Sequence, residues 1–419
     1  MPAANALHGH GREINPHQGL PARHNRVKMQ SSAHEPLMKL SGSAQCVALL
    51  GLSVSCQSPP NSGALAHTAR APASVVRSAP LPGFMRGMNL GNGLDAPSEG
   101  DWGVVLSERH FELVAAAGFD HVRLPVRFSA HARLDSPYTI QEPFFRRVDW
   151  AIDQALSRRL SVIVDLHHYV ELMASPDDHE QRFVAIWAQI AHRYRDRPAS
   201  VAFELLNEPS GKLTGSRWNA LLARAIAAVR ANNPSRTVIV DSCGFAAPQR
   251  LAELQVPTAD GGLVGSFHNY EPFLFTHQGA PWMGPEYQTP GIVFPGPPIQ
   301  PIEPAAGARE FDWVRDWIGR YNTQPTSTNP SGPSVVRRSF DLASEFIART
   351  GLRTYMGEFA VIDNADALSR AAYVRAVRQE AQRRGIGWAY WDDGGKNRIV
   401  DVERGAWVQP LAEALLGVP

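Results

Sequence analysis

The stretch "SVIVDLHH" (residues 161–168) is rich in β-branched residues and ends in polar ones, as a buried strand does when its far end reaches a functional face. Similar short runs recur from residue 84 onward, separated by segments of helical period. They are "GMNLG" (87–91), "HVRLPV" (121–126), "VAFELLNE" (201–208), "TVIVDS" (237–242), "LVGSFHNY" (263–270), "TYMGEFAV" (354–361) and "GWAYWDD" (387–393). Eight apolar strands that alternate with helices predict an α/β fold, a closed (β/α)8 barrel.

The segments between these runs have apolar residues at helical spacing. In "EPFFRRVDWAIDQALSRR" (142–159), Phe145, Val148 and Ile152 recur on one face, as in a helix that packs on a sheet. A doubly wound open sheet would show the same alternation of strands and helices. No glycine-rich phosphate-binding loop follows the first run, however, so the barrel is the main prediction. We expect residues 81–419 to form a single domain.

The first 80 residues have a different composition. The stretch 1–37 is rich in His, Pro, Gly and Ser, and a short apolar run from Cys46 to Cys56 lies further on. This run is too short to span a membrane but fits a signal peptide within residues 29–66. We therefore expect residues 1–80 to be a disordered leader and the protein to be secreted or periplasmic. A leader with no targeting role and a form lipid-anchored through Cys56 are the alternatives.

The charge of the chain gives little reason to expect a charged partner. It contains 41 Lys and Arg and 40 Asp and Glu, a formal net charge of +1, and the basic residues are scattered. This balance argues against binding of nucleic acid or of an anionic membrane surface, and it suits an uncharged partner. Without the leader only Cys243 would remain, which excludes an internal disulfide and a cysteine-based metal site. We expect a monomer.

Each strand-like run is apolar at its start and carries polar or aromatic residues at its end. These end residues are Arg123, His167, His168, Asn207, Glu208, His268, Tyr270, Glu358 and Trp391. In a parallel barrel the carboxyl ends of all strands share one rim, so these side chains are expected to converge there. Glu208 and Glu358, from the fourth and seventh strands, would then face each other. Cleavage of a glycosidic bond uses such a pair, with one carboxylic acid protonating the leaving oxygen and one carboxylate attacking the anomeric carbon.

Less specific interpretations are open for several of these residues. Arg123 could close a structural salt bridge, and Glu204 and Asp165 are interpreted as buried structural acids. His167 and His168 could form a metal pair, but neighbouring strand residues face opposite ways and no third ligand has zinc spacing. We therefore expect no metal. A metal-dependent hydrolase and a non-catalytic carbohydrate-binding protein are the rival functions.

The chain resembles glycoside hydrolase family 5, the cellulase family among the retaining barrel glycosidases. The segments that carry the resemblance are "RGMNLGNGLDAP" (86–97), "VRLPV" (122–126), "VIVDLHHY" (162–169), "LLNEP" (205–209), "HNYEPFLFTHQG" (268–279), "YMGEFAV" (355–361) and "WAYWD" (388–392). The tripeptide "NEP" alone is common, but all of these segments occur in order, each on its expected strand.

The resemblance implies a role for individual residues. It implies that Glu208 is the general acid/base and Glu358 the nucleophile, that Arg123 and Tyr270 hold the nucleophile ionised, and that Trp391 is the aromatic platform under the sugar. A raised pKa is expected for Glu208, which lies among apolar residues and near a second carboxylate. The residues with supporting or substrate-binding roles are Asn89, Arg123, His167, His168, Asn207, His268, Tyr270 and Trp391.

The resemblance further implies a retaining reaction through a covalent glycosyl-enzyme intermediate, without a cofactor and with carboxyl groups about 5–5.5 Å apart. The expected substrate is a β-glucan polysaccharide or oligosaccharide, cut as by an endo-β-1,4-glucanase. A long segment rich in Pro, Gly and aromatic residues (271–333) follows the sixth strand, and Trp282 within it could wall one end of the cleft. Mannan, xyloglucan, mixed-linkage glucan, β-1,3-glucan, exo-action and transglycosylation therefore stay open.

Overall fold

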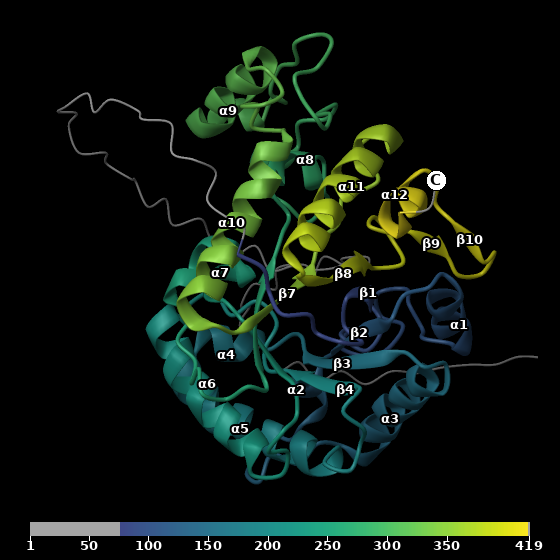
Figure 1. Cartoon of the computed structure of the whole chain (residues 1–419), viewed down its shortest axis with the longest axis vertical. Coiled ribbons are helices and arrows are strands. Elements are labelled where there is room, and N and C mark those ends of the chain that lie inside the picture. Colours follow the sequence, from purple (N-terminus) through teal and green to yellow (C-terminus); the bar gives the residue numbers. More distant parts are fainter. Residues whose placement is uncertain (1–75, 418–419) are drawn as a thin grey trace, which may run out of the picture. The chain divides into compact units, whose positions relative to one another are not determined.

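The predicted strand-like runs form one closed barrel in the computed structural model, which describes residues 76–417. Its strands are β1 (Arg86–Leu90), β2 (His121–Val126), β3 (Ser161–Leu166), β4 (Val201–Glu204), β5 (Val238–Asp241), β6 (Leu263–His268), β7 (Arg353–Glu358) and β8 (Gly387–Asp392). Neighbouring strands are parallel, and β1 pairs with β8 from Arg86 opposite Trp388 to Leu90 opposite Asp392, which closes the barrel (Figure 1). The expected (β/α)8 barrel is confirmed.

Helices connect the strands around the outside of the barrel. The α-helices are α1 (Glu108–Ala116), α2 (Phe128–His131), α3 (Glu142–Ser157), α4 (Val170–Ala174), α5 (Pro176–Arg193), α6 (Gly215–Arg230), α7 (Cys243–Ala246), α8 (Phe273–Thr276), α9 (Asp312–Thr323), α10 (Pro333–Thr350), α11 (Ala367–Arg384) and α12 (Leu411–Leu416). The 3-10 helices are η1 (Pro248–Glu253), η2 (Pro285–Tyr287) and η3 (Ala308–Glu310), and β9 (Val400–Asp401) pairs with β10 (Ala406–Trp407) outside the barrel.

The connection after β5 departs from the predicted pattern, because it contains no long helix. In its place are the single turn α7 and the 3-10 helix η1. Gly244 and Phe245 within α7 have φ angles of 67° and 63°, in the left-handed region, where an α-helix cannot continue. The Gly244 amide donates instead to the carbonyl of Pro209 at 2.6 Å, which ties this turn to the loop after β4.

The barrel interior is layered, because side chains two positions apart on a strand point to the same side. Its floor is a separate apolar cluster of Leu81, Phe84, Ile163, Ala202, Ile239, Val264, Tyr355 and Ala389. Two positions further along β3, β4, β5 and β6 lie Asp165, Glu204, Asp241 and Ser266, all fully buried. A polar layer therefore follows the apolar floor toward the carboxyl ends of the strands.

Several strands end earlier than their sequence runs suggest. The run 201–208 is extended only to Glu204, so Asn207 and Glu208 lie in the loop beyond β4. Glu208 has a φ angle of 51°, which is uncommon for a residue with a Cβ atom. Tyr270 likewise lies two residues beyond the end of β6. The chain therefore turns at the rim, and the turn aims these side chains across the barrel mouth.

The long segment between β6 and α10 is more ordered than its Pro-rich sequence suggests. It contains α8, η2, η3 and α9, and α9 is drawn in green near the top of Figure 1. Phe275, Phe294 and Tyr321 form a buried core within it, and the Val293 amide donates to the Tyr321 hydroxyl at 2.8 Å. Gln278 donates to the carbonyl of Ile292 at 2.8 Å and fixes one loop of the segment. The segment is thus a folded addition on the rim.

The described part of the chain begins slightly before the expected start of the domain at residue 81. The Ser78 amide donates to the carbonyl of Arg384 at 2.8 Å, and Ser78 is buried. The predicted signal peptide (29–66) lies outside the described residues. Among residues 76–417, no helix is both long enough and apolar enough to cross a lipid bilayer.

Candidate active site

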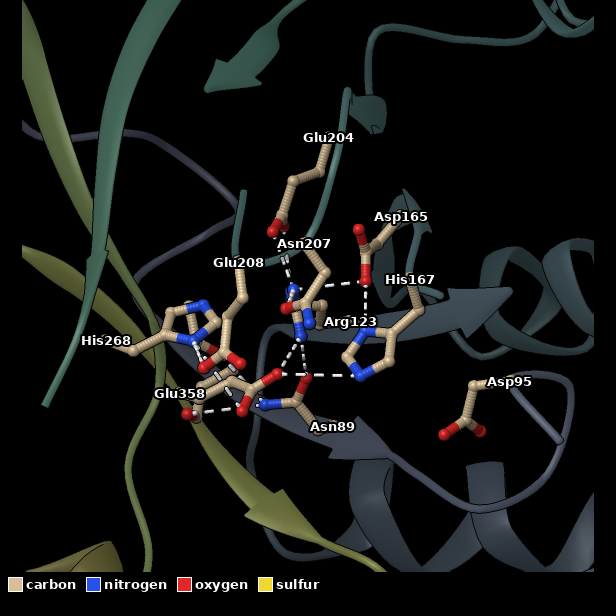
Figure 2. A network of polar contacts seen from close by, with 12 residues as sticks. Asn89, Asp95, Arg123, Asp165, His167, Glu204, Asn207, Glu208, His268 and Glu358 are labelled. Atoms are coloured by element: carbon tan, nitrogen blue, oxygen red, sulfur yellow. Dashed lines mark hydrogen bonds and ion pairs between the residues drawn. The ribbon is translucent and has the colours of Figure 1, made fainter. Parts of the chain in front are cut away.

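Arg123 on β2 is the centre of a buried polar network at the carboxyl end of the barrel (Figure 2). Its guanidinium is fully buried and makes a two-pronged contact with Glu204, with N–O distances of 2.6 and 2.8 Å. It also lies 3.0 Å from Asp165 and 2.7 Å from Glu358. Burial alone would lower the pKa of the Arg123 side chain, but these carboxylates together raise it, so the cation is permanent.

Glu358, the last residue of β7, is held by several donors. Oε1 accepts from Arg123, and Oε2 accepts from the Tyr270 hydroxyl at 2.8 Å. Nδ1 of His268 lies 3.7 Å from Oε2. The side chain is only 6% exposed, so its orientation is set by these partners rather than by water. A carboxylate fixed in this way between a cation and a hydroxyl group is suited to act as a nucleophile.

Glu208 faces Glu358 from the loop beyond β4. Its Oε1 accepts from Nδ1 of His268 at 2.9 Å, and its side chain keeps 26% of its exposure, which opens it to the rim. One carboxylate oxygen of Glu208 and one of Glu358 lie within 4.8 Å of each other, beside a ring nitrogen of His268. Burial raises the pKa of Glu208; the hydrogen bond from His268 opposes the rise, and the charge of Glu358 adds to it. The pKa of Glu208 is thus raised, as predicted.

His268 carries a positive charge close to both Glu208 and Glu358. Burial would lower its pKa, but the charges of Glu358, Asp241 and Glu208 outweigh burial and raise the pKa of His268 to about 9. The imidazolium form can donate from both ring nitrogens. His268 therefore balances part of the negative charge in a site where carboxylates outnumber cations.

The ring of His167 lies beside Glu358 and is stacked with the ring of Trp391. Their rings are stacked with an angle of 6° and a centroid distance of 5.3 Å. Burial and the neighbouring cations keep the pKa of His167 well below its usual value. Its Nδ1 lies 2.5 Å from Asp165, so the neutral ring donates there and keeps Nε2 as an acceptor, 4.0 Å from Glu358. A Cβ atom on Gly91 would lie 2.8 Å from the Trp391 ring, so this close approach requires glycine.

Asn89 and Asn207 have different surroundings. Asn89 donates to the Gly357 carbonyl at 3.0 Å and accepts from Arg123 at 2.8 Å. Both ends of its amide are thus used inside the barrel, and Asn89 supports the site from below. Asn207 accepts from Arg123 at 2.8 Å through its carbonyl oxygen, and its amino group is not engaged by a described residue. That group is available to a sugar hydroxyl.

The expectation that His167 and His168 point to opposite faces is wrong. Both lie beyond the end of β3, where strand alternation no longer applies, and their ring centroids are 4.6 Å apart. Asp95, which follows β1, lies with them, and one ligand atom of each residue falls within 4.8 Å of the others. A third potential ligand, the carboxylate of Asp95, therefore does accompany the two histidines. His168 Nε2 lies 3.9 Å from Asp95, and Trp102 packs edge-on against the His168 ring.

Asp95 itself stands to one side of the network in Figure 2. It is buried, and neither carboxylate oxygen makes a hydrogen bond within the described residues. Burial raises the pKa of Asp95 to about 7, against the influence of nearby backbone amides. Such a group can accept from a sugar hydroxyl when ionised and donate to one when protonated.

Trp282 is not brought into this network. It lies in the segment between α8 and η2, half-buried, and makes no ring contact with the residues around Glu358 in the described chain. Glu204 and Asp165, interpreted from the sequence as structural acids, both lie against Arg123. The residues that sequence reasoning missed are Asp95 and Asp241. Asp241 lies two positions after Ile239 of the barrel floor, and this spacing is the signal that could have found it.

Comparison with known proteins shows which family the chain matches. The family profile described as cellulase (glycosyl hydrolase family 5) matches residues 84–397, which include every strand of the barrel. Endoglucanase H of Acetivibrio thermocellus is 31% identical over 308 residues, which cover 74% of this chain and 29% of that protein. Endoglucanase C of the same organism is 26% identical over 326 residues, covering 74% of this chain and 91% of that protein. The chain thus spans about a third of one relative and nearly all of the other.

Solved structures resemble the fold as well. Crystal structures of Thermotoga maritima Cel5A in complex with mannotriose and with cellobiose are 35% identical in sequence. They superpose with a TM-score of 0.68 and cover 79% of this chain and 97% of that protein.

Proposed function

The chain belongs to the cellulase family, glycosyl hydrolase family 5, and from this premise we propose that it is a retaining endo-β-1,4-glucanase. The observation that carries the proposal is the pair formed by Glu208 and Glu358, whose oxygens approach within 4.8 Å at the rim. A short separation of this kind suits direct attack by one carboxylate, whereas an inverting enzyme needs room for a water between its two acids.

The proposed reaction has two steps. In the first, Glu358 attacks the anomeric carbon while Glu208 gives its proton to the leaving oxygen, so that the glycosidic bond breaks and a glycosyl ester forms. In the second, Glu208 takes a proton from water, which attacks the same carbon and releases Glu358. The raised pKa of Glu208 favours the protonated form that the first step needs.

The residues around this pair have assigned tasks in the proposal. Arg123 and Tyr270 keep Glu358 oriented, and the amino group of Asn207 is placed for the hydroxyl beside the reacting carbon. Trp391 provides the apolar face on which a sugar ring stacks, because the axial C–H bonds of glucose form an apolar surface. No cofactor takes part, because both steps move only protons and a glycosyl group.

The substrate class is supported by the names of the relatives, which are endoglucanases. The test is a panel of carboxymethylcellulose, barley glucan, glucomannan and xyloglucan with product sizing. A rapid fall in polymer length on the β-1,4-glucans would support endo-action. Release of short sugars alone, with the polymer length unchanged, would overturn it.

A β-1,4-mannan is the second candidate substrate. Its support is the mannotriose complex of the T. maritima protein. A higher kcat/KM on glucomannan than on barley glucan, with cuts at mannose units, would favour this candidate over the first.

We further propose that the enzyme is secreted or periplasmic and monomeric. The proposal of export is supported by the short apolar run within 29–66 and by the insoluble or extracellular nature of glucan polymers. Amino-terminal sequencing of protein recovered from the medium or periplasm tests the first point, and light scattering tests the second. Protein found only in the cytoplasm with an intact leader would contradict export.

A further inference from the structure

Asp241, the last residue of β5, lies directly behind the candidate acid/base. Its side chain is fully buried, and Oδ2 accepts from the Glu208 amide at 3.1 Å. The same oxygen lies 3.5 Å from Nε2 of His268. Oδ1 of Asp241 and Nε2 of His268 have no hydrogen bond within the described residues. The side chain of Ser266 on β6 is a further polar neighbour, and its interaction with Asp241 opposes the rise that burial causes in the pKa of this carboxyl. A buried carboxylate with so few partners is costly.

His268 connects the two acids. Its Nδ1 contacts Glu208 at 2.9 Å, and its opposite nitrogen faces Asp241. The three groups therefore form a line from the barrel interior to the rim. Rotation of the imidazole is restricted because a carboxylate lies against each nitrogen, and the ring is only 1% exposed.

Asp241 contacts Glu208 directly through the Glu208 backbone, in addition to the indirect path through His268. Glu208 has a φ angle of 51°, and the cost of this conformation has to be offset by the surrounding structure. Its amide points inward and finds its acceptor in Asp241. Asp241 is itself fixed from outside the barrel, because Nε1 of Trp218 on α6 donates to its carbonyl at 2.9 Å.

We propose that Asp241 is a positioning residue for the acid/base: it holds Glu208 in its left-handed backbone conformation and supports the imidazolium of His268 that hydrogen-bonds to Glu208. The proposal rests on the proposed function of Glu208. Asp241 would thus be an interior acid behind Glu208 and His268, which lie at the rim. The protonation of Glu208 would then depend on all three side chains.

The charge around this line is mostly negative. The charged groups that face it are Glu204 and Glu208 from β4 and its loop, Glu358 from β7, Arg123 from β2 and Asp165 from β3. Burial raises the pKa of Asp241 to about 7, and the charge of Glu204 adds to the rise. Above that pH an ionised Asp241 makes proton loss from the Glu208–His268 pair harder, since a negative charge raises the pKa of its neighbours.

The variants Asp241→Asn and Asp241→Ala separate the two contacts. Asparagine keeps an oxygen for the Glu208 amide and removes the charge, whereas alanine removes both. Activity is measured as kcat/KM against pH on barley glucan and on 2,4-dinitrophenyl cellobioside, whose leaving group needs no protonation. Asp392→Asn is the matched control, because Asp392 is also buried with a pKa raised to about 7 but accepts from backbone amides after β8.

For Asp241→Asn we expect the alkaline limb on glucan to move to lower pH by about one unit, while the aryl substrate is little affected. Asp392→Asn should leave the limb in place. An unchanged limb in Asp241→Asn, or an equal loss on both substrates, would overturn the proposal. Loss of folding in the alanine variant does not affect the asparagine test.

A second readout does not depend on activity. The ring of His268 is titrated by NMR in the wild type and in Asp241→Asn, and its pKa should fall in the variant. If the wild type cleaves none of the sugars while this pKa still falls, the positioning contact stands and the proposed function fails. If the pKa of His268 stays the same, the positioning role is refuted whatever the activity.

Discussion

The guanidinium of Arg123 lies 2.7 Å from Oε1 of Glu358, and the two side chains are 0% and 6% exposed. The same guanidinium contacts Glu204 and Asp165, so one cation serves three carboxylates. The orientation of Glu358 therefore depends on the interior of the barrel, because Arg123 belongs both to the site and to the buried network.

Replacing Arg123 should damage stability as well as activity. Arg123→Met would leave three buried carboxylates without a cation and is expected to cost about 3–5 kcal/mol of unfolding free energy. Urea denaturation followed by circular dichroism measures this. Arg147→Met is the control, because Arg147 also pairs with a carboxylate, Glu99, but is 28% exposed. Equal effects of the two substitutions would contradict a central role for Arg123.

Glu358→Gln should reduce turnover to background, since an amide cannot form the glycosyl ester. Circular dichroism should show a folded protein, because the glutamine oxygen can still accept from Arg123 while its amino group can donate to the hydroxyl oxygen of Tyr270. With the wild type, NMR of the first products should show retained anomeric configuration. Inverted products would contradict the assignment of Glu358 as nucleophile.

Glu208→Gln should lower kcat/KM on glucan by about 10²–10⁴-fold, the usual contribution of a general acid. The loss should be much smaller on an aryl cellobioside with an acidic leaving group, because that group departs without a proton. Comparison of the two substrates measures the effect. A similar loss on both would argue against an acid role.

The stability of the protein should depend on pH through His268. Its pKa is about 9 in the folded protein and 6.5 for a free histidine. The folded state therefore binds the proton more tightly, so the stabilisation is complete below pH 6.5 and is lost as the pH rises to about 9. We expect the unfolding free energy to fall by about 3 kcal/mol across that window.

Thermal unfolding at pH 6.5 and 9 checks this dependence in the wild type and in two variants. His268→Asn should remove much of the pH dependence. His277→Asn should leave it unchanged, because burial lowers the pKa of His277 to about 3 and this ring does not titrate in the window. The same slope in all three proteins would refute the assignment.

The three side chains Asp95, His167 and His168 approach one another closely enough to bind a metal ion. Because His167 donates to Asp165 and stacks on Trp391, we expect these groups to serve the sugar instead. Activity should be unaffected by EDTA and by added Zn²⁺ after dialysis. Loss of activity with EDTA, restored by a metal, would revive the metal-dependent alternative.

The sequence predicted the barrel well because its signal is repeated. Each strand is short, apolar and buried on both faces, and the run 121–126 matches β2 residue for residue. The ends of other runs were less well predicted, because apolar residues such as Leu205 and Leu206 continue beyond the hydrogen-bonded part of β4. Apolar character marks burial in this case, and the strand itself ends earlier.

The candidate site was predicted only in part, for a related reason. Side chains at strand ends were easy to recognise, and Glu208, Glu358 and Arg123 do meet. Asp95 follows β1 in a loop, and its proximity to His168 depends on how that loop folds. Asp241 ends an ordinary strand, and apart from its spacing of two positions from Ile239 nothing in its own run distinguishes it from a solvent-facing acid. The positions of Asp95 and Asp241 in the site depend on contacts with residues far away in the sequence, which the sequence alone does not show.

The apolar floor beneath the polar layer makes the lower half of the barrel independent of the chemistry. The apolar side chains of Ile163, Ala202 and Val264 fill it, and the backbone of Ile163 pairs with that of Arg123 in the sheet. Repacking these positions could therefore raise the temperature at which the protein survives without retuning its proton chemistry. For protein engineering, substitutions that raise stability are therefore best placed in the apolar layer, and the polar layer around Arg123 is best left unchanged.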